Sequence, residues 1–170
     1  MVEGTFSVLG RLANLNLRGV EFRTACMEAL AELPGYDWCG VYRLEPTSPG
    51  QASANSGRFA AMTQTETCEL VLDAYVGAPT EHDRIPIGRG VCGTAVSTGK
   101  NQIVDDVRDI DNYLSCSIET RSEIVVLIKK LGADQPILGQ IDIDSHQTGR
   151  FTKADEHMLE GIASLMAERW

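Results

Sequence analysis

The spacing of hydrophobic residues predicts helices at both ends of the chain. Between residues 20 and 33 apolar side chains recur every three or four positions, and a Pro-Gly pair then ends the segment. Residues 6–15 show a weaker form of the same period. Thr152 is a good N-cap, with Asp155 three positions later, for a final helix that reaches the last residue.

Between these helices the pattern changes to alternation or to short apolar runs bounded by turn residues. Strands are predicted over residues 37–44, 70–76, 101–107, 123–128 and 137–144. Residues 45–67 are rich in Pro, Ser, Gly, Ala, Asn, Thr and Gln, which indicates a long surface loop or insertion. Helices around a sheet of about six strands with hairpins predict one α+β domain over residues 1–170, with a mostly antiparallel sheet.

Composition and charge narrow the functional classes. With 170 residues, 43% of them hydrophobic, the chain can bury a core without cross-links. No apolar run is long enough to span a bilayer, and the first residues lack the features of a signal peptide, so we expect a cytoplasmic protein without a membrane partner. A net charge of −9 and the lack of a basic stripe argue against nucleic acid as a partner.

The five cysteines are an odd number spread over a mid-sized chain, so we expect reduced thiols rather than a disulfide framework. No C-x-x-C motif occurs, and the three histidines are scattered. We therefore expect no structural zinc and no other metal site.

Residues 88–93 match G-x-G-x-x-G, the pattern of a dinucleotide-binding turn. The helix predicted after them ends at Gly99, which is too short for a parallel crossover, and no acidic residue closes a next strand at the required distance. We therefore reject a nicotinamide or flavin cofactor. These glycines are better explained by a tight backbone turn beside a ligand.

Two cysteines are candidates for chemistry. Cys92 is predicted in the first turn of the short helix, where the helix dipole favours a thiolate, although a lone cysteine is equally well explained as a small buried hydrophobe. Cys116 lies in a polar loop between two serines, where no apolar period requires it, and this favours a functional role.

Three carboxylates are candidates for binding a cation. Asp142 and Asp144 are two positions apart on a strand, so they share one face, and a cation between them would relieve their repulsion. The alternative is a solvated strand end. Glu123 opens an apolar strand; if buried, its pKa would rise and it could donate a proton, but a polar residue at a strand end is also ordinary.

Trp38 and Tyr42 are four positions apart and also share one strand face. An aromatic core is the usual explanation of such a pair. The functional alternative is a wall around a thioether or sulfoxide group, because sulfur packs well against aromatic rings.

Taken together, four segments resemble a GAF domain, and in particular the free methionine-(R)-sulfoxide reductases built on that fold. They are residues 37–42 (DWCGVY), 84–95 (RIPIGRGVCGTA), 122–126 (SEIVV) and 138–145 (LGQIDIDS). The resemblance implies a thiol-dependent oxidoreductase that acts on free methionine sulfoxide without a bound cofactor. An external thiol reductant such as thioredoxin would restore it, and the terminal helices favour a homodimer.

The resemblance also implies roles for individual residues. Cys116 matches the nucleophile, which passes through a sulfenic acid, and Cys92 matches a second cysteine able to form a disulfide with it. Glu123, Asp142 and Asp144 match residues that hold the amino acid and assist protonation. Trp38 and Tyr42 match the aromatic wall around the substrate side chain.

The chain departs from the family pattern at several positions. His82 stands where the family commonly has another cysteine, residues 73–77 read DAYVG where GPFQG is usual, and Leu127 replaces a common proline. These changes keep a second interpretation open: a non-catalytic GAF module that senses a small molecule. They also leave Cys92 or an external thiol to resolve Cys116.

Overall fold

The computed structural model describes residues 3–47, 68–111, 113, 118–132 and 134–170 of the chain. Within them the helices are α1 (Glu3–Ala13), α2 (Gly19–Ala31), α3 (Gly90–Thr98) and α4 (Lys153–Glu168), with a 3-10 turn, η1 (Val107–Asp109). The strands are β1 (Trp38–Pro46), β2 (Cys68–Val76), β3 (Arg84–Pro86), β4 (Gln102–Val104), β5 (Ser122–Lys129) and β6 (Ile137–Ser145). None of the described helices is both long and apolar enough to cross a bilayer.

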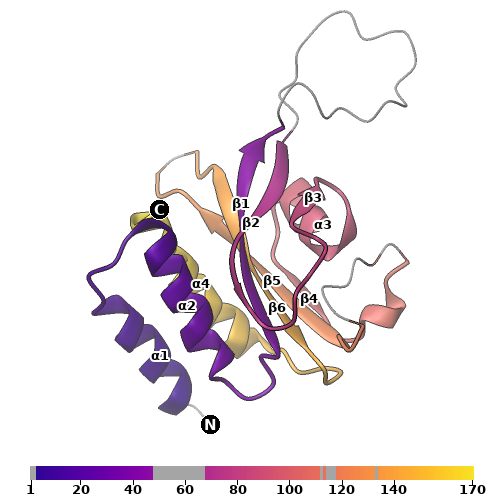
Figure 1. The fold of residues 1–170 in the computed structure, drawn as a ribbon, viewed down its shortest axis with the longest axis horizontal. Coiled ribbons are helices and arrows are strands. Elements are labelled where there is room, and N and C mark those ends of the chain that lie inside the picture. The colour runs from indigo at the N-terminus through magenta and orange to yellow at the C-terminus, as the bar shows by residue number, and fades with distance from the viewer. Residues whose placement is uncertain (1–2, 48–67, 112, 114–117, 133) are drawn as a thin grey trace, which may run out of the picture.

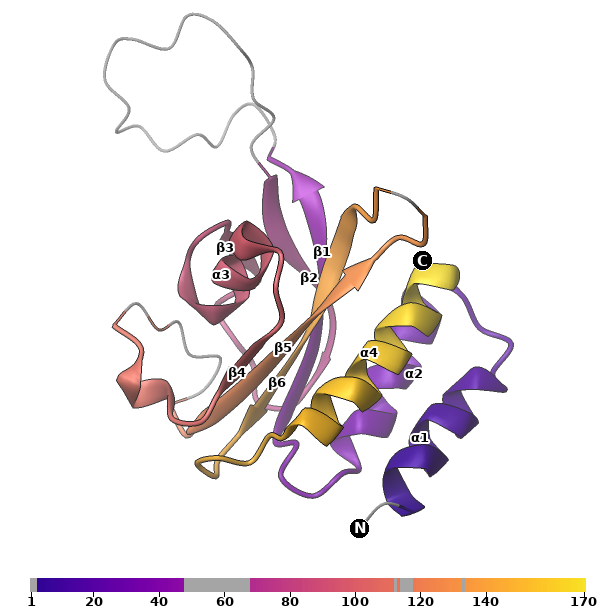
Figure 2. The same ribbon diagram turned by 180° about the vertical axis from the view of Figure 1, so that it is seen from behind.

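The described strands form one six-stranded sheet in the order β3-β2-β1-β6-β5-β4, with every neighbouring pair antiparallel. Helices α2 and α4 cover one face of the sheet, with α1 packed outside them, whereas α3 lies on the opposite face (Figures 1 and 2). The predicted α+β fold with a mostly antiparallel sheet is therefore confirmed.

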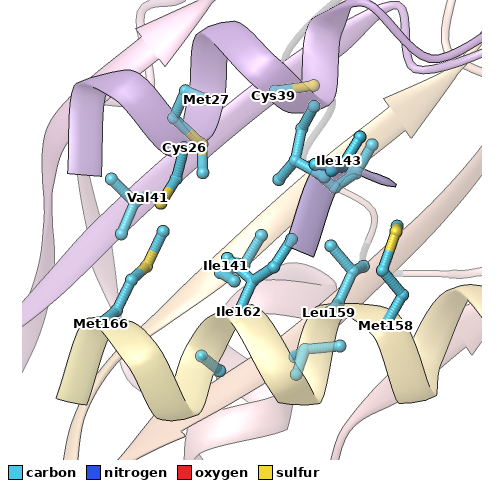
Figure 3. Packing of buried hydrophobic residues seen from close by; sticks show 14 of the residues in the cluster. Cys26, Met27, Cys39, Val41, Ile141, Ile143, Met158, Leu159, Ile162 and Met166 are labelled. Carbon is cyan, nitrogen blue, oxygen red and sulfur yellow. The ribbon is translucent and has the colours of Figure 1, made fainter. Parts of the chain in front are cut away.

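The main hydrophobic core lies between the sheet and the three helices α1, α2 and α4. Figure 3 shows its centre, where Ile141 and Ile143 of β6 meet Leu159 and Ile162 of α4, all four of them fully buried. The period that predicted α2 and α4 is the one that places their apolar side chains here. The predicted cap of α4 is also present, since Thr152 and Asp155 form a reciprocal capping box.

The structure corrects the predicted strand boundaries at three places. Strand β1 continues through Pro46, because Glu45 pairs with Glu69 and Pro46 with Cys68, so the expected loop does not begin at residue 45. Its remaining residues from 48 to 67 lie outside the described part of the chain. Of the strand expected over residues 101–107, only the three residues of β4 are a strand. The short strand β3 was not predicted.

Candidate acid–thiol site

The sheet brings the three predicted carboxylates together on the face opposite the helical core. Glu123 on β5 pairs directly with Asp144 on β6, and Asp142 is two positions further along the same strand face. These three residues, which we call the acidic cluster, are almost completely buried, with exposures of 3% for Glu123 and 1% for each aspartate. The alternative of a solvated strand end is therefore excluded for both aspartates.

Helix α3 places a thiol beside this cluster. Gly93 lets the first turn of α3 approach the end of β3, because a Cβ there would lie 2.6 Å from the Pro86 carbonyl oxygen. Cys92 is consequently held over β5, and its Sγ lies 3.9 Å from Oε1 of Glu123, to which it donates a weak hydrogen bond. Cys92 is only 5% exposed, so it is both a buried residue and a neighbour of the acids.

The surroundings favour the neutral form of Glu123. Burial raises the pKa of this carboxyl well above its usual value, and the negative charges of Asp142 and Asp144 raise it further. The nearby Tyr113 hydroxyl, which can donate to the carboxylate, acts in the opposite direction. Because the raising effects dominate, the site can hold a protonated carboxyl beside a thiol.

An aromatic wall borders the acidic cluster along β1. Trp38 pairs with Asp144, and its ring lies over Gly40, the strand neighbour of Asp142; a Cβ at residue 40 would overlap the ring. The indole Nε1 donates to the Ala78 carbonyl oxygen at 3.0 Å, and the ring stacks on Tyr75 with centroids 5.8 Å apart. The Trp38 ring is thus fixed from several sides.

Tyr42 lies on the same face and is fully buried in the cluster of apolar residues under α3. Its hydroxyl donates to the backbone carbonyl oxygen of His82 at 3.0 Å. Trp38 and Tyr42 are therefore part of a second hydrophobic core and also lie beside the acids. The structure places residue 82, where the family commonly has a cysteine, in contact with this wall.

Two further residues of the loop before β5 bear on the site. Cys116 lies outside the described residues, so its predicted role stays a prediction. Tyr113, by contrast, was missed: it stands in a polar loop with no period around it, and only the fold brings it to Glu123. No sequence signal of the kind used above could have found it.

A separate cavity of about 220 Å³ lies between β5 and α4, lined among others by Asn101, Lys129 and Glu160. Neither Cys92 nor any residue of the acidic cluster lines it. We place the candidate site at the acidic cluster because the buried charges and the thiol meet there.

Comparison with known proteins gives this chain relatives that carry a reductase name. Free methionine-R-sulfoxide reductase of Escherichia coli is 44% identical over 85 residues, which cover 50% of this chain and 48% of that protein. The chain thus matches about half the length of that relative.

Solved structures extend the likeness over most of the fold. The type II free methionine-R-sulfoxide reductase from Thermoplasma acidophilum superposes with a TM-score of 0.69 at 35% identity, covering 88% of this chain and 92% of that one. The reduced form of the Staphylococcus aureus fRMsr gives a TM-score of 0.74 at 30% identity, covering 99% and 93% of the two chains.

The family model of the GAF domain matches residues 21–170, which include every strand of the sheet, α3, and all the described residues of the site. The fold, the relatives and this match agree with the resemblance seen in the four sequence segments. The chain belongs to the GAF domain family.

Proposed function

We propose that this GAF domain reduces free methionine-(R)-sulfoxide to methionine. The observation that carries the proposal is the contact of the Cys92 thiol with Glu123 inside a buried acidic cluster, next to the fixed Trp38 ring. A redox thiol, a proton donor, a cation-binding group and an aromatic surface are what this reaction needs. The names of the relatives from E. coli, T. acidophilum and S. aureus support the same substrate.

The acidic cluster suits the ammonium group of a free amino acid. Asp142 and Asp144 are buried, and their repulsion falls when a cation binds between them. Trp38 and Tyr42 would contact the sulfur-bearing end of the side chain, since sulfur packs favourably on aromatic rings. Binding therefore orients the sulfoxide relative to Glu123.

In the proposed reaction the thiolate of Cys116 attacks the sulfoxide sulfur while Glu123 donates a proton to the oxygen. The sulfur–oxygen bond of the sulfoxide breaks as the oxygen bonds to the Cys116 sulfur, so that methionine leaves and Cys116 carries a sulfenic acid with the proton that Glu123 gave. The sulfoxide gains two electrons and the cysteine loses two. The raised pKa of Glu123 supports this role, because burial and the two neighbouring aspartates favour the protonated carboxyl that a proton donor needs.

Regeneration needs a second thiol. Cys92 condenses with the sulfenic acid, releasing water and forming a Cys92–Cys116 disulfide, which a thioredoxin-like dithiol reduces. Because His82 occupies the position of the additional cysteine, Cys92 is the described cysteine closest to the acids that can serve. An external thiol acting directly on Cys116 is the alternative for this step.

The second candidate function is a non-catalytic small-molecule sensor, and the observation that favours it is His82 itself. Its backbone carbonyl accepts from Tyr42, while its side chain supplies no thiol for a disulfide with Cys116. A sensor would keep the acidic cluster for binding an amino acid and would dispense with turnover. It would act through a partner or as a homodimer.

A thioredoxin-coupled assay with separated R and S epimers of free methionine sulfoxide tests the proposal. We expect turnover of the R epimer by the native chain and loss of turnover in Cys116→Ser. Cys68→Ser is the matched control, because Cys68 lies at the start of β2 away from the acids and should retain activity. Absence of R-epimer turnover by the fully reduced native chain, with methionine still bound, would establish the sensor instead.

Mass spectrometry after substrate treatment separates the two routes of regeneration. A Cys92–Cys116 disulfide supports internal resolution. A sulfenic acid at Cys116, or a mixed disulfide with the reductant, shows that an external thiol takes the place of Cys92.

A further inference from the structure

The thiol and the carboxylates of the candidate site form a donor set that also fits a metal ion. One ligand atom each from Cys92, Glu123 and Asp142 can be chosen so that all three lie within 4.8 Å of one another. All three residues are buried, and they come from α3, β5 and β6. We propose that the reduced chain binds a thiophilic divalent cation, Zn²⁺ in the first instance, between these three side chains.

The geometry is close to that of a bound ion. Zn–S and Zn–O bonds of about 2.3 Å and 2.1 Å in a tetrahedron place neighbouring ligand atoms roughly 3.4–3.6 Å apart. The Cys92 Sγ to Glu123 Oε1 distance is 3.9 Å, and the widest separation in the group is at most 4.8 Å. The separations must therefore contract by at most about 1.4 Å to reach the distances of a bound ion, a change within the reach of side-chain rotation.

The types of donor select the class of ion. A thiolate favours soft or borderline ions such as Zn²⁺, and carboxylates complete many zinc sites, whereas Mg²⁺ and Ca²⁺ prefer oxygen ligands alone. Asp144, which pairs with Glu123 across the strands, lies outside this set of three ligand atoms and would contribute its negative charge to the surroundings of the ion. No zinc motif is visible in the sequence because the ligands lie far apart along the chain.

A second observation points to a missing ligand at the same place. Oε2 of Glu123 is buried, and no donor or acceptor among the described residues makes a hydrogen bond to it. A buried carboxylate oxygen without a partner is costly, and a cation coordinated there would remove that cost. The charged groups that act most strongly on the Glu123 carboxyl are two further carboxylates, and the Tyr113 hydroxyl that acts against them is neutral.

The metal and the substrate would exclude each other. This consequence alone rests on the proposed function, because it assumes that the ammonium group of methionine sulfoxide occupies the acidic cluster. The metal site itself rests only on the positions of Cys92, Glu123 and Asp142. Free Zn²⁺ would then hold the reduced thiol of Cys92 in place and keep the reductase inactive until the ion is removed.

Binding of Co²⁺ to the reduced, metal-free chain is the direct test, because cobalt bound to a thiolate shows a charge-transfer band in the near ultraviolet. We expect the band with the native chain and its loss in Cys92→Ser. For Zn²⁺ measured by calorimetry, Cys92→Ser and Glu123→Gln should each weaken binding by more than the roughly 10–100-fold that loss of an outer-shell partner costs. Both variants should keep the native circular dichroism spectrum.

The controls separate this site from adventitious binding. Cys68→Ser and Asp106→Asn remove a thiol and a carboxylate elsewhere, and both should leave the cobalt band and the Zn²⁺ affinity unchanged. The proposal would be overturned if Cys92→Ser kept the cobalt band while Cys116→Ser or Cys68→Ser lost it. It would also be overturned if Glu123→Gln bound Zn²⁺ as tightly as the native chain. Neither measurement uses enzyme activity, so a failed reductase assay leaves this result intact.

Competition completes the experiment. Saturating free methionine sulfoxide should weaken the Zn²⁺ affinity of Cys116→Ser, a variant that cannot consume the substrate. Intact Zn²⁺ binding without any such competition would count against the proposed substrate site and not against the metal site.

Discussion

The two faces of the central sheet are both buried, but they are built on different principles. On the face under α2 and α4, residues such as Ile141 and Ile143 belong to one large cluster of buried hydrophobic residues (Figure 3). On the face under α3, the alternate positions of the same strand carry Asp142 and Asp144, which are equally buried beside Glu123. The first face stabilises the fold, whereas the second holds buried carboxylates whose mutual repulsion lowers stability.

This difference shows where the molecule departs from the simplest design of a stable domain. Three carboxylates at 1–3% exposure would ordinarily be replaced by apolar residues, since burial of like charges lowers stability. Their presence on one face only, beside a thiol, makes that face the candidate functional face. The predictions below test this division, beginning with the largest expected effect.

Glu123→Gln should have the largest effect, and it should act on catalysis rather than on folding. We expect kcat/KM for the R sulfoxide to fall by about 10²–10⁴-fold, because a positioned proton donor is lost. Steady-state kinetics beside a thermal melt measures both quantities. A variant with native kcat/KM would remove Glu123 from the proposed mechanism.

Ile143→Ala tests the helical face. The fully buried side chain lies in the main core, so we expect the free energy of unfolding to fall by about 2–5 kcal/mol. Urea denaturation measures this change. Because Ile143 points away from the acids, KM of the folded fraction should stay native, and a KM that changes more than the stability would contradict the division between the faces.

Gly40→Ala should disturb the wall on the functional face. The added Cβ would overlap the Trp38 ring, so the ring must move, at a cost of roughly 1–3 kcal/mol of stability. KM should rise, since the displaced ring contacts the substrate in the proposed complex. Tryptophan fluorescence reports the movement, and an unchanged spectrum with unchanged KM would show that the fit is not tight.

Asp142→Asn should stabilise the protein while it weakens function. Removing one of the two neighbouring aspartate charges relieves repulsion, and we expect the free energy of unfolding to rise by about 1 kcal/mol near neutral pH. Methionine binding, followed by calorimetry, should weaken at the same time. Loss of stability in this variant would mean that Asp142 supports the fold.

Replacement of Asp155 should have the smallest effect on stability. In contrast to Glu123, this carboxylate has a lowered pKa and stabilises the start of α4. Burial alone would raise its pKa, but donors on Thr152 and Tyr36 and the charge of Arg150 outweigh burial and hold the pKa below its usual value. Its contribution is therefore present above the pKa of the unfolded chain and is lost as the pH falls through the folded pKa.

We expect Asp155→Asn to lower stability by about 1 kcal/mol at neutral pH and by less in acid. Urea denaturation at a series of pH values measures the difference. Equal destabilisation at all pH values would show that the charge of Asp155 is not what matters.

Much of this fold was open to prediction because local patterns determine it. The period of three to four residues located α2 and α4, and the pair Thr152 and Asp155 located the start of α4. Alternation in β6 placed Asp142 and Asp144 on one face before any partner strand was known. In each case the information lies within a few neighbouring residues.

The arrangement of the site required contacts that no local pattern records. The pairing of Glu123 with Asp144 depends on strand register, and the approach of Cys92 depends on how tightly α3 packs beside β3. Strand β3 was missed because three residues carry too little pattern, and the end of β1 was missed because a Pro-containing edge resembles a loop. The role of Cys116 still depends on the family resemblance alone.

The alternation of Ile141, Asp142, Ile143 and Asp144 makes core and site inseparable. If β6 slipped by a single residue along its neighbours, the acids would turn into the helical layer and the isoleucines would fill the space beneath α3. Such a chain would lose both the stability that the buried isoleucines give and the ability to bind its ligand. Selection for a stable domain therefore also maintains the orientation of the acids. A mutant that folds stably must have kept the native register of β6.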